Sequence, residues 1–310
     1  MNDVRITHLD GSLPNLALMR LAGYHRKMGH NITFTRSPYR DLFEPEFDRV
    51  YGSTIFTRSK PVVDIFKSEF PGALVGGTGS GDSTTIEQVV GKVPLENSAI
   101  NYDIYPKFKQ SIGFTQRGCR LKCGFCVVPK KEGKNHDNMS VHEIWRGDPY
   151  PRELVLLDND FFGQPDWREK AKEIIRFNFK VNFNQGINVR LIHEEGAEHL
   201  SRMRYYDVRF KKRRLYTAWD NEKDEKHFFK GFNILLNAGI SPGHIMVYML
   251  VGYWPGETME SILYRFNKIN DAGAMPYPMV YNDKNRNLKR FQRWVCRRYY
   301  KFIPWDKYKR

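Results

Sequence analysis

The chain has 310 residues, of which 41% are hydrophobic and 27% charged, and a formal net charge of +15. Four cysteines do not make a disulfide framework, and the most apolar stretch, residues 245–254, is too short to span a bilayer. The composition thus excludes a disulfide-stapled secreted protein and a membrane-spanning one. No basic segment followed by an apolar one stands at the start, so we expect a cytoplasmic protein without a signal peptide.

Residues 1–100 alternate strand and helix patterns, as a small α/β unit does. Apolar residues at helical spacing predict a helix over residues 15–30, which Gly29 closes as a left-handed residue. A second helix is predicted through residues 63–66, and residues 78–98 are predicted to form a loop-rich connection. Strands are predicted at 4–9, 31–35, 48–57 and 72–77.

A second alternation of strands and helices begins near residue 108. Strands are predicted at 111–115, 153–158, 180–184, 214–220, 244–251 and 277–281, with helical patterns near 140–147, 166–178, 193–203, 224–238 and 258–272. Strands separated by helices favour parallel pairing through right-handed crossovers. Periodicity does not decide between an open sheet and a curved partial barrel. In both, functional sites gather where the strands end.

Three of the four cysteines stand within eight residues, in the stretch GCRLKCGFC that follows the first strand of this second alternation. Structural zinc normally takes four ligands in paired motifs; no second pair exists, and His136 and His142 are expected on the surface. A thiol redox centre needs two cysteines rather than three. Three thiolates, from Cys119, Cys123 and Cys126, leave one iron of a cubane [4Fe–4S] cluster without a protein ligand, which opens that iron to chemistry.

The pattern Cys-x3-Cys-x-Phe-Cys, with Phe125 before the last cysteine, resembles the signature of the radical S-adenosylmethionine superfamily. The resemblance covers roughly residues 108–285 and implies a partial (β/α)6 barrel with the cluster loop after its first strand. It implies two cofactors, a [4Fe–4S] cluster on the three cysteines and S-adenosylmethionine bound to the open iron. In this family one electron cleaves S-adenosylmethionine to a 5′-deoxyadenosyl radical, which removes a hydrogen atom from the substrate.

The same resemblance implies which residues at the strand ends bind S-adenosylmethionine. Those after the second strand would accept its methionine amino group, and the amides after the third strand would hold the ribose. Arg190 would pair with the methionine carboxylate; the alternative is a salt bridge on the first turn of a helix. Residues after the fifth strand would surround the adenine, Trp219 would lie near the site, and Lys130 or Lys131 would face substrate or solvent. The implied binders are Phe125, Asp158, Asn159, Asp160, Asn184, Gln185, Asn188, Arg190, Asp220, Val251 and Gly252.

Residues 1–100 resemble a truncated cobalamin-binding domain, through the first strand, the helix after it and the later stretch LVGGTGSG. The loop after the first strand, HLDGSLPN, lacks the motif that supplies a cobalt-ligating histidine in that family. We therefore expect no bound cobalamin and a degenerate domain kept as a lid or substrate platform. The predicted domains are this unit at 1–100, a radical S-adenosylmethionine core at 101–285 and a basic aromatic extension at 286–310.

Basic charge is concentrated near the C-terminus, where residues 283–310 hold eleven Lys or Arg and two Asp, with seven aromatic residues among them. A second basic run lies at residues 211–214. Basic and aromatic residues together suit phosphate contacts and base stacking, which makes nucleic acid an expected partner. The alternative is an amphipathic helix whose aromatic residues close the core while its charges face solvent.

Absent motifs narrow the expected reaction. Cysteines for auxiliary clusters or for methylthio transfer are missing, and cobalamin-dependent methylation lacks its loop motif. Hydrogen abstraction followed by rearrangement, bond cleavage or reversible abstraction is what is left. We expect an isomerase-type enzyme that acts on a hypermodified nucleic acid base and takes electrons from a flavodoxin or ferredoxin. The alternatives are the same chemistry on an amino acid or nucleotide, and a non-catalytic iron–sulfur protein that binds nucleic acid.

Overall fold

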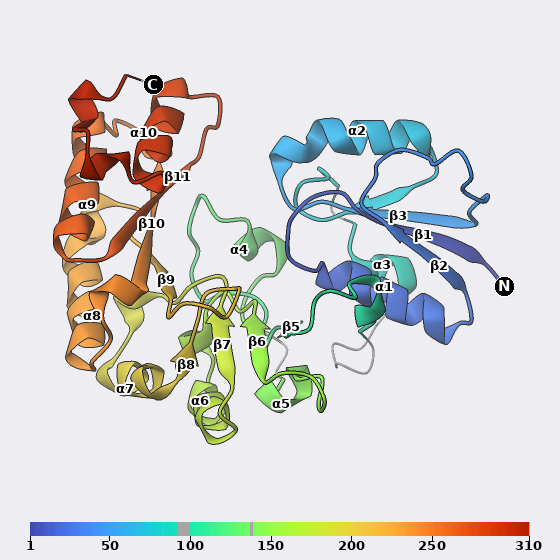
Figure 1. Cartoon of the computed structure of the whole chain (residues 1–310), viewed down its shortest axis with the longest axis horizontal. Helices are drawn as coiled ribbons and strands as arrows, with labels where there is room; N and C mark the ends of the chain where they lie inside the picture. The colour runs from blue at the N-terminus through green and yellow to red at the C-terminus, as the bar shows by residue number, and fades with distance from the viewer. Residues whose placement is uncertain (83, 92–99, 137–138, 310) are drawn as a thin grey trace. The chain divides into compact units, whose positions relative to one another are not determined.

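Two units make up the chain in the computed structural model, which describes residues 1–82, 84–91, 100–136 and 139–309. The first unit comprises Met1–Ile112 and Arg146–Pro151, and the second comprises Gly113–Trp145 and Arg152–Arg310. Figure 1 traces both units from blue at the N-terminus to red at the C-terminus. The division falls after Ile112, and the basic C-terminal stretch belongs to the second unit.

The first unit is built on a parallel sheet in the order β2-β1-β3-β4. Its strands and helices are β1 (Asp3–His8), β2 (Asn31–Thr35), β3 (Arg49–Ser53), β4 (Leu74–Gly76), α1 (Leu16–Lys27), α2 (Lys60–Glu69) and α3 (Ile86–Val90). The four strands and the first two helices confirm the sequence prediction, and Gly29, at φ 72°, closes α1. The predicted loop over 78–98 contains α3, and its residues 83 and 92–98 lie outside the described residues.

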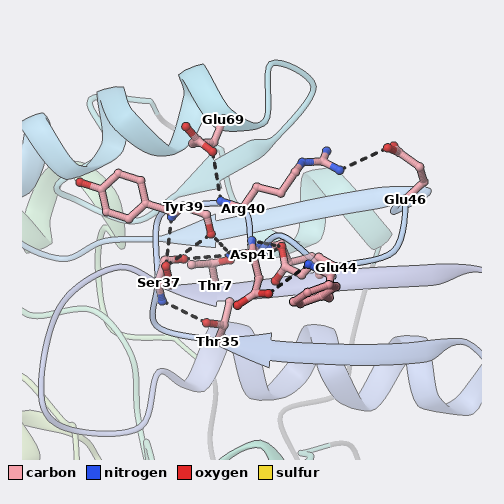
Figure 2. Close-up of polar contacts among 11 residues, drawn as sticks. Thr7, Thr35, Ser37, Tyr39, Arg40, Asp41, Glu44, Glu46 and Glu69 are labelled. Carbon is pink, nitrogen blue, oxygen red and sulfur yellow. Dashed lines mark hydrogen bonds and ion pairs between the residues drawn. The ribbon is translucent and has the colours of Figure 1, made fainter.

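A buried arginine of β1 holds the loop between β2 and β3 in place. Arg5 is 0% exposed, and its Nη2 donates to the carbonyl oxygens of Ser37 (3.0 Å) and Tyr39 (2.9 Å). Its Nη1 forms an ion pair with Glu44. Two apolar residues at the tip of the loop, 42–43, are each 88% exposed. Further polar contacts of this loop, drawn in Figure 2, involve Thr35, Ser37, Tyr39, Arg40, Glu46 and Glu69.

The second unit carries two sheets, in the orders β5-β6-β7-β8 and β11-β10-β9, and the pairs β6–β7, β7–β8, β9–β10 and β10–β11 are parallel. Its strands are β6 (Glu153–Leu156), β7 (Lys180–Phe183), β8 (Arg204–Tyr205), β9 (Leu215–Ala218), β10 (Ile245–Val251), β11 (Met275–Val280) and β5 (Ser111–Gly113), the last of which contains the division between the units. Its helices are α4 (Val128–Lys131), α5 (Val141–Ile144), α6 (Trp167–Arg176), α7 (Glu194–Arg202), α8 (Glu225–Asn237), α9 (Met259–Asp271) and α10 (Arg286–Cys296). The six predicted strands and five predicted helices are confirmed. The chain is therefore a mixed α/β protein with parallel sheets.

The remaining regular structure is short. Single 3₁₀ turns lie at Thr57–Ser59, Tyr102–Ile104, Phe161–Gly163, Val189–Leu191, Glu222–Asp224, Pro242–His244, Tyr299–Lys301 and Trp305–Lys307. Within the described ranges, no helix combines the length and apolar character needed to cross a membrane.

The basic C-terminal stretch forms an amphipathic helix followed by short turns. The inward side of α10 buries Leu288, Phe291, Trp294 and Val295, and Tyr308 is buried further along. Its exposed basic residues are Lys284, Arg286, Arg293, Arg297, Arg298, Lys301, Lys307 and Lys309. The alternative of a core-closing helix with solvated charges is confirmed here. Because Phe291, Trp294 and Tyr308 are buried, they do not stack on a nucleic acid base.

Candidate functional site

The three clustered cysteines lie on the loop between β5 and α4 in the second unit. An isolated bridge between the backbones of Arg117 and His136 pairs the start of this loop with the segment that follows α4. The Cys119 amide donates to the Gly133 carbonyl at 3.2 Å, and the Cys126 amide donates to the Cys123 carbonyl at 3.0 Å. We call this segment, residues 114–127, the cysteine loop. Its free thiols, each partly buried, are those of Cys119, Cys123 and Cys126.

Burial favours the neutral form of these thiols. Desolvation raises the pKa of Cys119 and of Cys123, and the negative charges of neighbouring thiolates and carboxylates add to the rise. For Cys123 the Arg190 guanidinium acts in the opposite direction, through its charge and a hydrogen bond. Over the described residues, no three or more Cys, His, Asp or Glu side chains are gathered in a metal-binding group. The chemistry of the donor set, three partly buried thiols on one loop, nevertheless suits an iron–sulfur cluster.

Phe125, just before the last cysteine, packs against the loop that follows β10. Its ring centroid lies 5.5 Å from that of Tyr253 and 6.3 Å from that of Trp254, edge to face in both cases. Gly124 lies next to the same tyrosine, because a Cβ built there would stand 2.9 Å from the Tyr253 hydroxyl. The cysteine loop and the loop after β10 therefore pack together.

Asp158 is buried and ties the end of β6 to the end of β5. Its carboxylate accepts hydrogen bonds from the Thr115 amide (3.2 Å), the Thr115 hydroxyl (2.5 Å) and the Gln116 amide (2.8 Å). Desolvation nonetheless raises the pKa of Asp158 to about 6. Because the chain itself occupies these acceptors, Asp158 positions the strand ends in this structure.

Replacing Asp158 with asparagine is expected to change how stability depends on pH. A carboxyl whose pKa rises from 3.8 to about 6 on folding binds its proton more tightly in the folded state. This group therefore makes stability fall, by roughly 3 kcal/mol, as pH rises from about 4 to about 6, and adds no slope above that. Urea unfolding across this range measures the slope in both proteins. The variant should lack it, and equal slopes would contradict the raised pKa.

Asn159 and Asp160, the next two residues, contact the cysteine loop and the segment after it. Asn159 Nδ2 donates to Glu132 Oε2 at 3.2 Å, and Asp160 Oδ2 lies 2.8 Å from Arg120 Nε in an ion pair. Burial raises the pKa of Asp160, and the charge of Arg120 opposes that rise. The structure thus brings the end of β6 against the cysteine-bearing segment.

Of the residues predicted after β7, some contact other parts of the candidate site and some do not. Gln185 is exposed, whereas Asn188 Oδ1 accepts a hydrogen bond from Arg190 Nε at 3.4 Å. Arg190 Nη1 forms an ion pair with Asp224 Oδ2 at 2.7 Å, and its guanidinium also reaches Cys123. A salt bridge, the alternative role expected of Arg190, is thus present with Asp224, and the charge of Arg190 also acts on the cysteine loop at Cys123.

Asp220, Val251 and Gly252 lie at the ends of β9 and β10. Asp220 Oδ1 accepts a hydrogen bond from the Leu250 amide at 3.1 Å, and burial raises its pKa. Val251 is fully buried, and the Gly252 amide donates to Glu257 Oε2 at 2.5 Å. These polar groups tie the two strand ends and the loop after β10 to one another.

Trp219 belongs to the core of the second unit. It is fully buried, and its ring is stacked on that of Phe228, with the centroids 5.2 Å apart. The structure therefore gives Trp219 a packing role. The two lysines that were expected to face substrate or solvent, Lys130 and Lys131 on α4, are exposed.

Sequence reasoning missed three buried polar side chains on or beside the strands. Gln116 Nε2 after β5, Asn182 Oδ1 on β7 and Thr217 Oγ1 on β9 are buried, and none has a hydrogen-bond partner in the described part of the chain. Leaving such an atom unpaired costs free energy, so these positions suit a ligand or water. The available signal was a polar residue inside an otherwise apolar strand, as in KVNF and LYTA.

In the first unit, an aspartate in the loop after β1 binds the segment that follows β3. Asp10 accepts hydrogen bonds from the Thr54 hydroxyl (2.6 Å) and from the amides of Ile55 (2.7 Å) and Phe56 (2.9 Å). His8, at the end of β1, is buried, and burial lowers its pKa to about 4. A neutral histidine and an engaged aspartate therefore stand where this sheet ends.

No family model matches the chain, and neither does any curated protein. Among solved structures, one described as a mutation variant of SsGBP aligns with 97% of this chain and 98% of that one, at 9% identity and a TM-score of 0.20. A likeness this weak carries no argument about fold or function. The evidence for the candidate site therefore comes from the chain's own residues and their contacts.

Proposed function

We propose that the chain is a radical S-adenosylmethionine enzyme that abstracts a hydrogen atom from a hypermodified nucleic acid base, which then rearranges. The cysteine loop carries the proposal, because its thiols follow β5 with the superfamily's spacing. The packing of Phe125 against the loop after β10 supports it, since that places a second strand end beside the cysteines.

On this proposal, the two sheets of the second unit correspond to the family's partial (β/α)6 barrel. The candidate residues follow β5, β6, β7, β9 and β10, at the carboxyl ends of strands, where α/β folds carry their sites. The sheets also meet directly, because the Ile187 amide after β7 donates to the Tyr216 carbonyl of β9 at 2.8 Å.

Cys119, Cys123 and Cys126 would hold the cluster. When bound, a [4Fe–4S] cluster supplies one-electron reduction of S-adenosylmethionine, the chemistry with which this family starts hydrogen abstraction. The thiols must lose their protons to bind iron, and burial by itself favours the protonated form of two of them. The nearby Arg190 guanidinium favours the thiolate of Cys123 and so assists iron binding.

Arg190 is also the best-placed partner for the methionine carboxylate of S-adenosylmethionine. Its guanidinium stands beside Cys123 and has several N–H donors, which Asn188 and Asp224 occupy only in part. The methionine amino group suits Asp160, whose carboxylate contacts Arg120 of the cysteine loop. Asp158 would act on this site by positioning the ends of β5 and β6.

A base in nucleic acid is the substrate class that the charge favours. The net charge is +15, and the basic residues of α10 and the turns after it are exposed. A base must leave its stack to meet a radical formed at the cysteine loop, so the substrate would be single-stranded or flipped out. A flavodoxin or ferredoxin would supply the electron.

A small molecule, such as an amino acid or nucleotide, is the alternative substrate for the same chemistry. The burial of Phe291, Trp294 and Tyr308 favours it, because these aromatic residues of the C-terminal stretch cannot stack on bases. Deleting residues 286–310 would not distinguish the two substrate classes, because side chains of α10 belong to the core and the deletion would damage the fold. A turnover assay that compares nucleic acid with small molecules distinguishes them.

The test is turnover after anaerobic reconstitution with iron and sulfide, using S-adenosylmethionine, a chemical reductant and deuterated candidate substrates. The proposal expects 5′-deoxyadenosine that carries deuterium from the nucleic acid substrate, read by mass spectrometry. Deuterium transfer from a free nucleotide alone would assign the small-molecule alternative. Absence of 5′-deoxyadenosine from protein that holds an intact cluster would overturn the enzyme function itself.

A further inference from the structure

The sheet β9-β10-β11 has a covered face and an open face. Alternate residues such as Thr217, Val247 and Met249 are buried, and helices α9 and α10 contact β10 and β11 (Figure 1). Residues of the other parity point away from that side. Among them, Tyr277 is 37% exposed, and Tyr281, just past the end of β11, is 57% exposed. Aromatic side chains on this face are thus open to a binding partner.

Tyrosines form a row on the open face. The rings of Tyr216 and Tyr248 are stacked, 5.7 Å apart and 5° from parallel, and Tyr277 meets Tyr248 edge to face at 5.6 Å. Tyr281 lies 4.9 Å from Tyr253, which in turn contacts the phenylalanine of the cysteine loop. We call Tyr216, Tyr248, Tyr277 and Tyr281 the tyrosine face. It extends from β9 toward the cysteine loop.

Arginines stand at the starting end of the same strands. Arg214, just before β9, donates from Nη1 to the Met275 sulfur at the start of β11, at 2.7 Å. Burial lowers the pKa of Arg214, and the nearby charge of Arg298 lowers it further, against Asp207. Arg213, the preceding residue, is turned to β8 instead: its guanidinium lies 3.8 Å from the Tyr205 ring centroid and donates to the Met203 carbonyl at 3.1 Å. We call Arg214 and Arg298, the exposed arginine that follows α10, the arginine cluster; both are positively charged.

We propose that the tyrosine face binds a segment of single-stranded nucleic acid, with bases stacked on the tyrosines and phosphates held by the arginine cluster. The proposal rests on the proposed function and deepens it, because the row of aromatic rings leads a strand toward the cysteine loop. Every base has an aromatic face, so stacking tolerates any sequence, while the arginines complement the phosphates. The seven residues of β10 span about 23 Å, a length that seats several nucleotides.

Charge argues against a second copy of this chain as the occupant of the face. The chain carries +15, so a partner copy would bring like charge against the arginine cluster. A nucleic acid strand brings the opposite charge together with flat rings. Nucleic acid is therefore the occupant that matches both features of the surface.

The test is fluorescence anisotropy with labelled DNA and RNA single strands of about 12 nucleotides, within the range of single-strand sites. Full-length protein is expected to bind at about 50 mM salt and to lose affinity steeply toward about 200 mM. Tyr277→Ala should weaken binding by about fivefold or more, the loss of one base stack. Arg298→Asn should weaken it and reduce the salt slope, because a phosphate contact is lost. The DNA and RNA arms show which strand the face prefers.

Two matched variants serve as controls. Tyr264→Ala removes a tyrosine of similar exposure, 38%, from α9, and Arg202→Gln removes an exposed arginine at the end of α7. Both should bind as the unaltered protein does. The proposal is overturned if Tyr277→Ala binds as tightly as Tyr264→Ala, if no strand binds at low salt, or if sizing shows a dimer that Tyr277→Ala dissociates. Because the assay needs neither cluster nor reductant, failed turnover leaves its outcome unaffected.

Discussion

Replacing Cys123 with alanine is expected to remove S-adenosylmethionine cleavage almost completely. The cluster would lose one of its three thiol ligands on the cysteine loop. Residues that merely support a metal ligand already change activity by about 10- to 100-fold, so loss of a ligand should exceed about 100-fold. The measurements are 5′-deoxyadenosine formed per minute, bound iron per chain and the absorption of the reconstituted cluster.

Cys296→Ala is the matched control, because Cys296 is the chain's fourth cysteine and is exposed at the end of α10. It should keep full iron content and full turnover. The same urea midpoint in both variants would show that the fold survives each change. Normal iron content and turnover in Cys123→Ala would remove the foundation of the proposed function.

Glu257→Ala is expected to destabilise the second unit by roughly 3–5 kcal/mol, the range for breaking a buried ion pair. Arg265 is 1% exposed and pairs with Glu257 at 2.5 Å, while its other donors bond the carbonyl oxygens of Trp219 and Leu250, both at 3.0 Å. Removing the carboxylate takes from a buried guanidinium the one acid that bonds it directly and leaves only the more distant charges of Asp220 and Glu222. It also frees the Gly252 amide at the end of β10.

Tryptophan fluorescence during urea unfolding measures this loss selectively, because all six tryptophans lie in the second unit. Glu225→Ala is the control: it removes two surface contacts, an ion pair with Lys268 at 3.2 Å and a hydrogen bond from the Tyr264 hydroxyl at 2.9 Å, and should cost about 1 kcal/mol. Equal losses in the two variants would show that the buried pair adds nothing beyond a surface pair.

The order of strands and helices could be predicted because hydrophobic periodicity is a local property. β10, with seven mostly apolar residues, and α9, with its repeated buried positions, give clear patterns. The two-residue strand β8 and the four-residue helix α4 are too short to leave one. The arrangement in two sheets depends on contacts between distant segments, such as that of Ile187 with Tyr216, and so could not be predicted.

The sequence could predict which segments form the candidate site, but not the contacts of their individual side chains. Cys119, Cys123 and Cys126 were evident from their spacing, and the polar residues after each strand followed from the rule on strand ends. Whether a carboxylate oxygen in these segments is free to bind a ligand depends on its contacts with residues distant in the sequence. Asp158 and Asp160 are two residues apart, yet the first accepts three bonds from the end of β5 and the second pairs with Arg120.

The buried Arg5 makes the loop between β2 and β3 part of the folded core of the first unit. If this loop detached, the buried Arg5 guanidinium would lose its carbonyl and carboxylate partners. Burying a charge without partners costs much free energy, so detachment is strongly unfavourable. The loop should therefore resist proteases until the sheet itself opens, unlike an ordinary surface connection. Insertions that lengthen it before Glu44 would be tolerated poorly, because they displace the groups that neutralise Arg5.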